Sequence, residues 1–502
     1  MGKMTTIPVK VKHNGKVYDI SLNPASNGLA FKQAIAEATH VPPERQKVMI
    51  KGGLLKDNTN LSQIDVRSGQ TFMVIGAVGE LPKAPAKPIQ FLEDMPEEAL
   101  TQAQPWRGGL VNLGNTCYLN STLQVLRSME PLQEALTAYT PRVGASEGDA
   151  SLVAALRDLY RDMAKTSDAM PPLVFLSILR KLAPQFGEMA EGGTGYAQQD
   201  AEEAWIRIVQ ALSLLPAAGA PNDRFVSRYL TGSVDIERRC VENADEAPSQ
   251  LTEPFQMLQC NISSSTNDME SGISDSFTQQ LEKHSDTLQR VASYEEKRRI
   301  SRLPLFLPVH FVRFYWRRDI QKKTKIMRKV KFPKEWDASG LVTEALAAQI
   351  APVRNKMRDI GKERDERAKL RARARGLAGG AGAVEGGALT DEQEKEQRAK
   401  EAAELDSIIS ADLRNDPGCN ASGLYELVGI VTHKGAAADA GHYMSWVRRE
   451  PRADEALMGP SNEWYKFDDD QVSVVPADKL DSLSGGGEDS VAYLLLYRAK
   501  TL

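Results

Sequence analysis

The sequence predicts an α+β protein in two folded parts: a small sheet that wraps over one helix, and a larger mixed domain behind a linker. The chain has 502 residues, too many for one core of ordinary size. Strand-like and helix-like apolar patterns alternate up to Ile75. Residues 79–105 then lose any periodic apolar face and are rich in Pro, Ala and charge, which is typical of a linker.

The N-terminal pattern predicts a β-grasp domain. Apolar and polar residues alternate on both sides of Asn14-Gly15, which indicates a hairpin over residues 5–22 with a type I′ turn. A short helix is expected at Leu29–Ala38, where apolar residues fall on one face. Further strands are expected at Lys47–Ile50 and Thr71–Ile75.

Composition excludes several functional classes. Hydrophobic residues make up 41% of the chain and charged residues 26%, which is ordinary for a globular protein. A net charge of −4 gives no drive toward nucleic acid or membrane phosphate. The N-terminus lacks the apolar run of a signal peptide, and no later stretch is apolar enough to span a bilayer. We therefore expect neither a nucleic-acid nor a membrane partner.

Four cysteines occur, at positions 117, 240, 260 and 419, and none is paired as CxxC. This spacing predicts neither a disulfide framework nor a zinc site. No metal and no cofactor are expected. Free thiols fit a reducing compartment, so we expect the protein in cytoplasm and nucleus.

Residues 108–126, GGLVNLGNTCYLNSTLQVL, contain the candidate nucleophile. Apolar residues at helical spacing follow Cys117, and Asn115 and Thr116 are good N-cap residues, so a buried helix is expected to begin there. A cysteine in the first helical turn faces unpaired N–H groups and the positive end of the dipole, which favour the thiolate. The Asn112 amide lies in the preceding loop, where it could donate to an oxyanion beside the sulfur. Taken alone, such a cysteine can also be purely structural.

His442 is the candidate base for this thiol. It begins the alternating strand HYMSWV, and a second strand, Trp464–Phe467, ends at Asp468. If the two strands pair as an antiparallel hairpin, Asp468 lies beside His442 and holds the imidazole in the tautomer that accepts a proton from sulfur. Asp469 is an alternative orienting residue. The other five histidines have no comparable partner nearby in sequence.

These motifs resemble those of the ubiquitin-specific proteases. The stretch around Cys117 is similar to their Cys box, YELVGIVTHKGAAADAGHYMSWV with EWYKFDDDQVSVV to their His box, and GYAQQDAEEAW to the box that lines their cleft. The resemblance implies a papain-like domain with thumb, palm and fingers over residues 106–500, and ubiquitin as the substrate. It assigns nucleophile to Cys117, base to His442, orienting carboxylate to Asp468 and oxyanion donor to Asn112.

The resemblance also implies residues that bind substrate. Gln198, Gln199 and Asp200 match the motif that supports the cleft and the ubiquitin tail, and we add Tyr443, which follows the predicted base. Many relatives carry four zinc cysteines in the fingers. In this chain Cys240 has no CxxC partner and no second pair exists, so no competent zinc site is expected.

The segment VPPERQKVMIKGGLLKDNTNLSQIDVRSGQTFMVIG resembles ubiquitin, which implies a ubiquitin-like domain over residues 4–78. The chain continues where ubiquitin ends in Arg-Gly-Gly, so this domain is expected to dock rather than to be conjugated. Met49, Met73 and Ile75 align with the apolar patch that ubiquitin receptors grip; the alternative is that they are ordinary surface residues. Together with RRISRLPLFLPVHFVRFYWRRD, the domain resembles proteasome-associated family members and implies docking to the 26S regulatory particle.

The larger domain contains an insertion at about residues 350–416. Its first part is charged and predicted to be helical, and AGGAGAVEGG is a low-complexity break. We interpret the charge run as a solvated helix rather than a binding element. Segments at Gly435–Gly441 and Tyr315–Lys325 match loops that cover the tail groove in the resembled members; the alternative is that both are ordinary connections.

The sequence thus predicts a thiol-dependent deubiquitinase that cleaves the isopeptide bond at the ubiquitin C-terminus of proteasome-bound substrates. Two alternatives stay open. One is an inactive ubiquitin-binding scaffold, against which the intact triad argues. The other is a protease for a different ubiquitin-like modifier.

Overall fold

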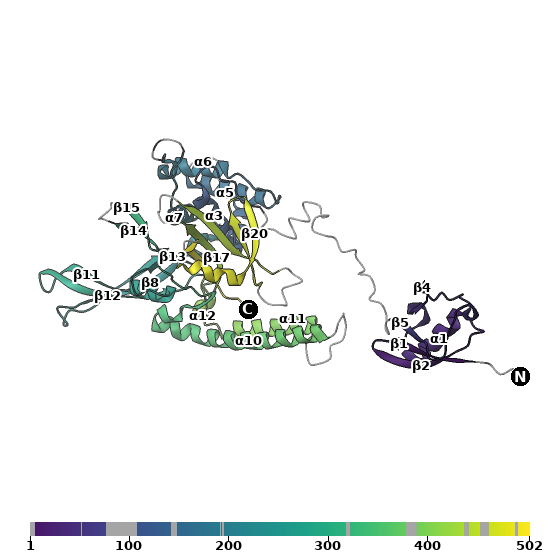
Figure 1. The fold of residues 1–502 in the computed structure, drawn as a ribbon. Coiled ribbons are helices and arrows are strands. Elements are labelled where there is room, and N and C mark those ends of the chain that lie inside the picture. Colours follow the sequence, from purple (N-terminus) through teal and green to yellow (C-terminus); the bar gives the residue numbers. More distant parts are fainter. Residues whose placement is uncertain are drawn as a thin grey trace. The chain divides into compact units, whose positions relative to one another are not determined.

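The computed structural model describes residues 6–51, 53–76, 108–141, 148–190, 192, 195–317, 322–377, 389–435, 441–451, 461–486 and 490–501. They form two compact units that divide between Ile89 and Gln90 (Figure 1). This division falls within the predicted linker 79–105, which lies outside the described residues. Within the described ranges, no helix combines the length and apolarity needed to cross a membrane.

The N-terminal unit is a five-stranded sheet packed on one helix. The strands run in the order β2-β1-β5-β3-β4, with β1 and β5 parallel and the other pairs antiparallel. Its elements are β1 (Ile7–His13), β2 (Lys16–Leu22), α1 (Gly28–Thr39), β3 (Lys47–Ile50), β4 (Gly53–Leu54) and β5 (Thr71–Ile75). The inward side chains of Val11, Ile35 and Val48 are fully buried between sheet and helix. This arrangement confirms the β-grasp prediction.

Local sequence determines these elements closely. Asn14 and Gly15 have φ of 45° and 80°, the two positive values that a type I′ turn requires. Asn27 accepts a hydrogen bond from the N–H of Ala30 and so starts α1, one residue before the predicted start. The strands predicted at Lys47–Ile50 and Thr71–Ile75 are found with the same bounds.

The larger unit begins with a helical part. Its helices are α3 (Cys117–Arg127), α4 (Glu130–Ala138), α5 (Asp149–Met163), α6 (Leu173–Leu182), α7 (Ala201–Leu212) and α8 (Phe225–Tyr229). The short strands β6 (Pro216–Ala217) and β7 (Ala220–Arg224) pair with each other. All eleven residues of α3 are buried, because α4, α7 and the large sheet surround it.

An eight-stranded sheet forms the centre of this unit. The strand order is β10-β13-β21-β17-β18-β19-β20, and β16 pairs with β17. The strands are β10 (Leu258–Asn261), β13 (Phe306–Val312), β16 (Glu335–Asp337), β17 (Leu424–Lys434), β18 (His442–Arg448), β19 (Glu463–Asp468), β20 (Gln471–Pro476) and β21 (Val491–Ala499). Alternate residues of β17 and β21 enter two separate apolar cores, so both faces of the sheet are covered.

A second, four-stranded sheet projects from the unit (Figure 1). Its order is β11-β12-β8-β9, from β8 (Gly232–Cys240), β9 (Ser249–Phe255), β11 (Thr278–Ser285) and β12 (Arg290–Arg302), and α9 (Met269–Ser276) precedes β11. The helical part, the large sheet and this projecting sheet correspond to the expected thumb, palm and fingers. The α+β prediction is confirmed.

Apolar packing and hydrogen bonds hold the tip of the projecting sheet. Cys240 is buried with Ala292 and Tyr294. The Glu246 carboxylate accepts hydrogen bonds from the Ser285 hydroxyl at 2.6 Å and the Tyr294 hydroxyl at 2.5 Å. No group of three or more His, Cys, Asp or Glu side chains suited to a metal ion occurs in the described part of the chain.

We expect prolonged dialysis against a strong chelator to leave the melting temperature and activity unchanged, because the apolar packing of Cys240 and the hydrogen bonds of Glu246 join these strands. Differential scanning fluorimetry and a turnover assay on the dialysed protein check this. Stoichiometric zinc by elemental analysis, lost together with several degrees of melting temperature, would contradict it.

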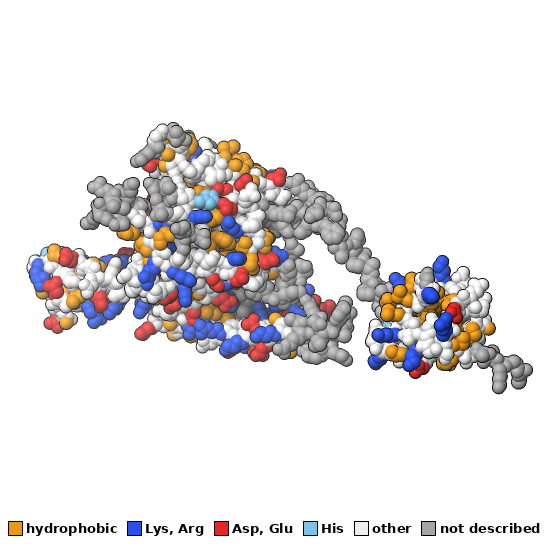
Figure 2. Space-filling model, viewed as in Figure 1, with side chains coloured by type: hydrophobic (Ala, Val, Ile, Leu, Met, Phe, Trp, Pro, Cys, Tyr) orange, Lys and Arg blue, Asp and Glu red, His pale blue; other side chains and the backbone are white. Residues whose placement is uncertain are grey.

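The insertion forms a helical hairpin. Helix α10 (Glu344–Leu377) pairs with α11 (Asp391–Ile408), and α12 (Ala411–Arg414) follows. Charged side chains of both signs alternate along the exposed surface of this hairpin (Figure 2). Thr390 and Gln393 form a capping box at the start of α11. The stretch AGGAGAVEGG lies outside the described residues.

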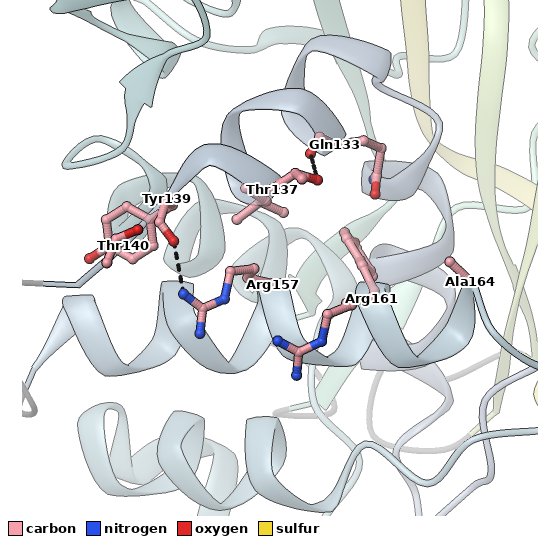
Figure 3. A pocket seen from close by; sticks show the side chains of 9 residues that line it. Gln133, Thr137, Tyr139, Thr140, Arg157, Arg161 and Ala164 are labelled. Atoms are coloured by element: carbon pink, nitrogen blue, oxygen red, sulfur yellow. Dashed lines mark hydrogen bonds between the residues drawn. The ribbon is translucent and has the colours of Figure 1, made fainter.

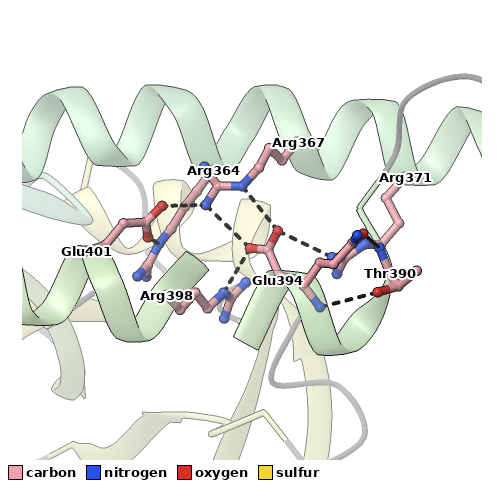
Figure 4. A network of polar contacts seen from close by, with 8 residues as sticks. Arg364, Arg367, Arg371, Thr390, Glu394, Arg398 and Glu401 are labelled. Carbon is pink, nitrogen blue, oxygen red and sulfur yellow. Dashed lines mark hydrogen bonds and ion pairs between the residues drawn. The ribbon is translucent and has the colours of Figure 1, made fainter. Parts of the chain in front are cut away.

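The contact between α10 and α11 combines a small apolar cluster, which includes Met357 and Leu405, with an ionic network. Glu394 and Glu401 are each 2% exposed, on the side of α11 that faces α10. Arginines of both helices surround these two carboxylates (Figure 4): Arg364, Arg367, Arg371 and Arg398. The interpretation of this charge run as simply solvated is therefore incomplete, since part of it forms a buried network.

Strands β14 (Phe314–Arg317) and β15 (Lys322–Lys325) form a hairpin within the segment predicted to be a loop. Cross-strand pairing therefore extends into this segment from both sides, and its role in covering the tail groove stays a prediction. Residues 318–321 and 436–440, the central parts of the two predicted covering loops, lie outside the described residues.

Candidate active site

Cys117 is the first residue of α3, as predicted, and its side chain is 3% exposed. Gly114 and Asn115 before it have φ of 94° and 55°, so the chain turns sharply into the helix. Thr116 is the N-cap residue, but its hydroxyl accepts from the N–H of Leu113 at 2.9 Å and caps no helical N–H. The thiol therefore lies at an uncapped helix N-terminus, where the dipole favours negative charge.

His442 and Asp468 lie together at adjoining ends of β18 and β19. The two strands are antiparallel neighbours, as the sequence predicts, and α3 packs against β18. His442 Nε2 lies 2.6 Å from Asp468 Oδ1, and the Lys466 ammonium lies 3.3 Å from the other carboxylate oxygen. Both side chains of the pair are about one-third exposed. Because Nε2 is occupied by the carboxylate, Nδ1 is the nitrogen available to Cys117.

The site favours a protonated imidazole. A hydrogen bond with Cys117 is the main cause that raises the pKa of His442 to about 9; burial opposes it and the Asp468 carboxylate adds to it. Burial would raise the pKa of Asp468, but hydrogen bonds with His442 and Lys466 prevail and lower it. At neutral pH, His442 is therefore mostly imidazolium beside the sulfur, the arrangement that stabilises a thiolate.

Two N–H groups also point at the sulfur. The Gln198 amide nitrogen lies 3.6 Å from Cys117 Sγ, and the backbone nitrogen of Tyr443 lies 3.5 Å from it. Gln198 comes from the segment before α7, whereas Tyr443 belongs to β18. The Gln198 side chain and the Tyr443 backbone, from two distant segments, thus contact the same sulfur atom.

Asn112 is exposed beside the site, and Asp469 orients it. The Asn112 amide donates to Asp469 Oδ2 at 2.8 Å, and the Asn120 amide donates to Asp469 Oδ1 at the same distance. Asp469, considered from sequence only as a rival to Asp468, contacts amides and not the imidazole in these hydrogen bonds. No pattern in the sequence indicates this role, because the pairs are separated by 357 and 349 residues.

The remaining predicted substrate residues lie in or near the same region. Asp200 is the N-cap of α7 and accepts a hydrogen bond from the Tyr493 hydroxyl at 2.6 Å. Gln199 is half-buried between Gln198 and Asp200. The ring of Tyr443 is buried, so a substrate contact at this residue would use its backbone.

In the N-terminal unit, the predicted docking residues form an exposed patch. Met49 and Met73 are paired across β3 and β5, and with Ile75 they are 48%, 51% and 57% exposed. A shallow cavity with Lys12 on its wall adjoins Met73 and Ile75. Hydrophobic and basic side chains lie together on the visible face of this unit (Figure 2).

A separate cavity of about 570 Å³ lies between α4 and α5 (Figure 3). Its wall includes Arg157, whose guanidinium donates to the Tyr139 carbonyl at 2.8 Å, and Arg161 one turn later. Both arginines also pair with Asp158 on the same helix. None of the predicted site residues lines this cavity.

Comparisons with known proteins identify the family. The family model described as "Ubiquitin carboxyl-terminal hydrolase" matches residues 108–497, and the model "Ubiquitin family" matches residues 7–78. Ubiquitin carboxyl-terminal hydrolase 6 of Schizosaccharomyces pombe is 39% identical over 497 residues, which cover 99% of each chain. Ubiquitin carboxyl-terminal hydrolase 6 of Arabidopsis thaliana is 35% identical, with 99% of each chain covered. Ubiquitin carboxyl-terminal hydrolase 14 of Caenorhabditis elegans is 29% identical, covering 98% of this chain and 94% of its own. The chain therefore belongs to the ubiquitin carboxyl-terminal hydrolase family of cysteine-type enzymes and carries a ubiquitin-like domain at its N-terminus.

Proposed function

We propose that this chain is a proteasome-associated deubiquitinase that hydrolyses the isopeptide bond between the ubiquitin C-terminus and a lysine. The observation that carries the proposal is the contact of three side chains. Cys117 at a helix N-terminus lies beside His442, and the Asp468 carboxylate holds His442 in place. A thiol protease needs a thiolate, an imidazolium and a carboxylate. In this cluster the His442 imidazolium contacts both the Cys117 sulfur and the Asp468 carboxylate.

In the proposed first half-reaction, the Cys117 thiolate attacks the terminal carbonyl of ubiquitin, and a tetrahedral oxyanion forms. His442, protonated at neutral pH, gives its proton to the departing lysine amine as the C–N bond breaks, which leaves a thioester. In the second half, the now neutral His442 takes a proton from water and the hydroxide adds to the thioester. The C–S bond then breaks, so that free ubiquitin departs as the acid and the thiolate–imidazolium pair of Cys117 and His442 is restored. Asp468 keeps the imidazole aligned through both steps.

The oxyanion has two candidate donors. Asn112 presents an amide whose orientation is fixed by Asp469, and the Gln198 amide already reaches the sulfur to which the reacting carbon becomes bonded. A preoriented amide stabilises charge that develops in the transition state and needs no reorganisation. We assign Asn112 the oxyanion role expected from sequence and include Gln198 as a second donor. Gln199, Asp200 and the Tyr443 backbone support the ubiquitin tail.

The exposed patch of Met49, Met73 and Ile75 supports docking of the ubiquitin-like domain to the proteasome regulatory particle. These side chains are about half exposed on a sheet whose other face is filled by α1, so they contribute little to the fold. Apolar side chains in such a position are available to a partner. The four cysteines are all free thiols, which supports a cytoplasmic and nuclear location.

Deleting residues 1–78 is expected to weaken binding to proteasome while leaving the basal rate of the remaining chain nearly intact, because the two units have separate cores. The change Ile75→Asp in the full chain should weaken binding about tenfold or more, since losing one buried apolar contact costs roughly 1.4 kcal/mol or more. A ubiquitin–fluorophore assay with and without ubiquitin-depleted proteasome checks both, with a large gain expected only where docking is intact.

The matched control is Leu29→Asp. Leu29 is 39% exposed on α1, which covers the other face of the sheet, so a charge is introduced in the same domain away from the patch. Full activity of the isolated chain without any response to proteasome would contradict the proposed association. Equal effects of the two substitutions would contradict the assignment of the patch.

A further inference from the structure

Lys325 is a buried cation close to the candidate active site. It is the last residue of β15 and is only 4% exposed. Its ammonium lies 2.9 Å from His433 Nδ1, 2.7 Å from the His433 carbonyl oxygen and 3.1 Å from the Gly435 carbonyl oxygen. A lysine ammonium has three N–H donors, and these contacts use all three.

Two acceptors belong to His433 near the end of β17 and the third to Gly435 just after it; β17 pairs with the strand that carries the site. His433 is opposite Tyr443 and Lys434 is opposite His442 in the antiparallel register of β17 and β18. Lys325 therefore fastens the backbone directly across from the proposed base. Without these bonds, the buried carbonyl group and ring nitrogen of His433 and the half-buried carbonyl group of Gly435 would lose this donor.

Ring packing continues the connection to the sulfur. The His433 ring contacts the Tyr443 ring edge to face, with centroids 4.6 Å apart, and contacts Phe314 of β14 at 5.2 Å. The backbone N–H of Tyr443 then reaches Cys117 Sγ at 3.5 Å. A chain of described contacts thus runs from Lys325 through His433 and Tyr443 to the nucleophile.

The approach to His442 is equally tight. Gly441 has φ of 149°, and a Cβ atom at this position would lie 2.5 Å from His433 Nε2 and 2.3 Å from the Lys434 carbonyl oxygen. Only glycine fits there. The backbone that enters β18 is therefore packed against the same histidine that Lys325 holds.

Burial determines the protonation states of His433 and Lys325. Burial, aided by the charges of Lys325 and His442, lowers the pKa of His433 to about 3, so the ring is neutral. Burial and the nearby Arg313 guanidinium lower the pKa of Lys325 to about 8, which leaves the ammonium as the main form at neutral pH. His433 Nδ1 must then accept from the ammonium, and Nε2 carries the proton.

We propose that Lys325 is a positioning residue for the hydrolase reaction: through His433 and the end of β17, it sets the placement of His442 and Tyr443 around the Cys117 sulfur. The inference rests on the proposed roles of Cys117 and His442. It adds a residue outside the triad and its substrate motifs, supplied by the β14–β15 hairpin.

The test uses the full-length chain and the small electrophile iodoacetamide, which needs neither ubiquitin nor proteasome. The rate of Cys117 alkylation against pH, followed by peptide mass spectrometry, reports the imidazole beside the sulfur. We expect Lys325→Met to slow alkylation at neutral pH about tenfold or more and to change the dependence of the alkylation rate on pH, because the imidazole is no longer held beside the sulfur. In the same variant, turnover should show a lower kcat with a nearly unchanged KM. Lys325→Arg should restore part of the alkylation rate and part of kcat. The matched control is Lys329→Met, an exposed lysine four residues later.

A second measurement needs no substitution at Lys325. Nitrogen-15 spectra of the histidine rings, with His433 assigned by its loss in His433→Gln, should show Nδ1 unprotonated and Nε2 protonated at pH 7. A proton on Nδ1, or Lys325→Met with wild-type alkylation and turnover, would overturn the inference. An active Cys117→Ala variant would instead overturn the proposed function, so the two failures are distinguishable.

Discussion

The change Cys117→Ala is expected to abolish hydrolysis of a ubiquitin–fluorophore substrate by the full-length chain in the presence of proteasome. The loss should be on the order of 10⁶-fold, the size seen when the nucleophile of a catalytic triad is removed. No other cysteine can substitute, because Cys240, Cys260 and Cys419 are placed by other elements and none is hydrogen-bonded to His442. Initial rates of fluorophore release, measured with ubiquitin-depleted proteasome, check this.

The matched control is Cys419→Ala, which makes the same change at a half-buried thiol whose partner is the Leu413 carbonyl. It should turn over at the wild-type rate. Ubiquitin binding should survive in Cys117→Ala, because the change removes one buried sulfur atom and leaves the other proposed substrate-binding residues in place. Residual release by the pure variant well above the uncatalysed rate would show that the nucleophile is another residue.

The change Asp468→Asn is expected to lower kcat by up to about 10⁴-fold, because an amide can hold the imidazole in the wrong tautomer and cannot stabilise its charge. The Asp468 carboxylate helps to raise the pKa of His442 to about 9, so its loss lowers that pKa. In the variant, His442 then loses its proton at a lower pH than in the wild type, so it stops protonating the leaving amine at that lower pH. The alkaline limb of the kcat profile should therefore move to lower pH in the variant, as steady-state rates between pH 6 and 10 would show.

Asp470→Asn is the matched control, since this neighbouring carboxylate is exposed and hydrogen-bonded to Gln471. It should leave both kcat and its pH profile unchanged. Asp469→Asn separates the two candidate orienting residues. If it proved more damaging than Asp468→Asn and shifted the same pH limb, the orienting role would belong to Asp469.

Much of the fold could be predicted because its signals are local. The Asn14-Gly15 turn and the helix that begins at Cys117 each follow from a few neighbouring residue types, and the two strands that pair before Asp468 are consecutive in the chain. The cysteine, histidine and aspartate come together because each lies at the end of an element that the sequence already delimits.

Other features depend on distant partners and left no local pattern. The contact of Lys325 with His433 joins residues 108 positions apart, and that of Asn112 with Asp469 joins residues 357 apart. The segment YWRRDIQKKTK, which ends at Lys325, has the composition of an exposed hairpin. The burial of Lys325 could therefore not be inferred from the sequence. The burial of the α11 carboxylates could not be predicted either, because Glu394 and Glu401 belong to a charged run whose other residues are mostly exposed.

The proposed function is tested most directly by the site at which a ubiquitin with a C-terminal electrophile becomes attached. The electrophile is delivered by ubiquitin itself, so attachment requires recognition of ubiquitin and a reactive nucleophile at its C-terminus. We expect one adduct per chain, mapped by peptide mass spectrometry to Cys117, with labelling faster when 26S proteasome is present. An adduct at Cys240, Cys260 or Cys419, or no adduct under either condition, would contradict the assignment of this chain as a deubiquitinase that acts through Cys117.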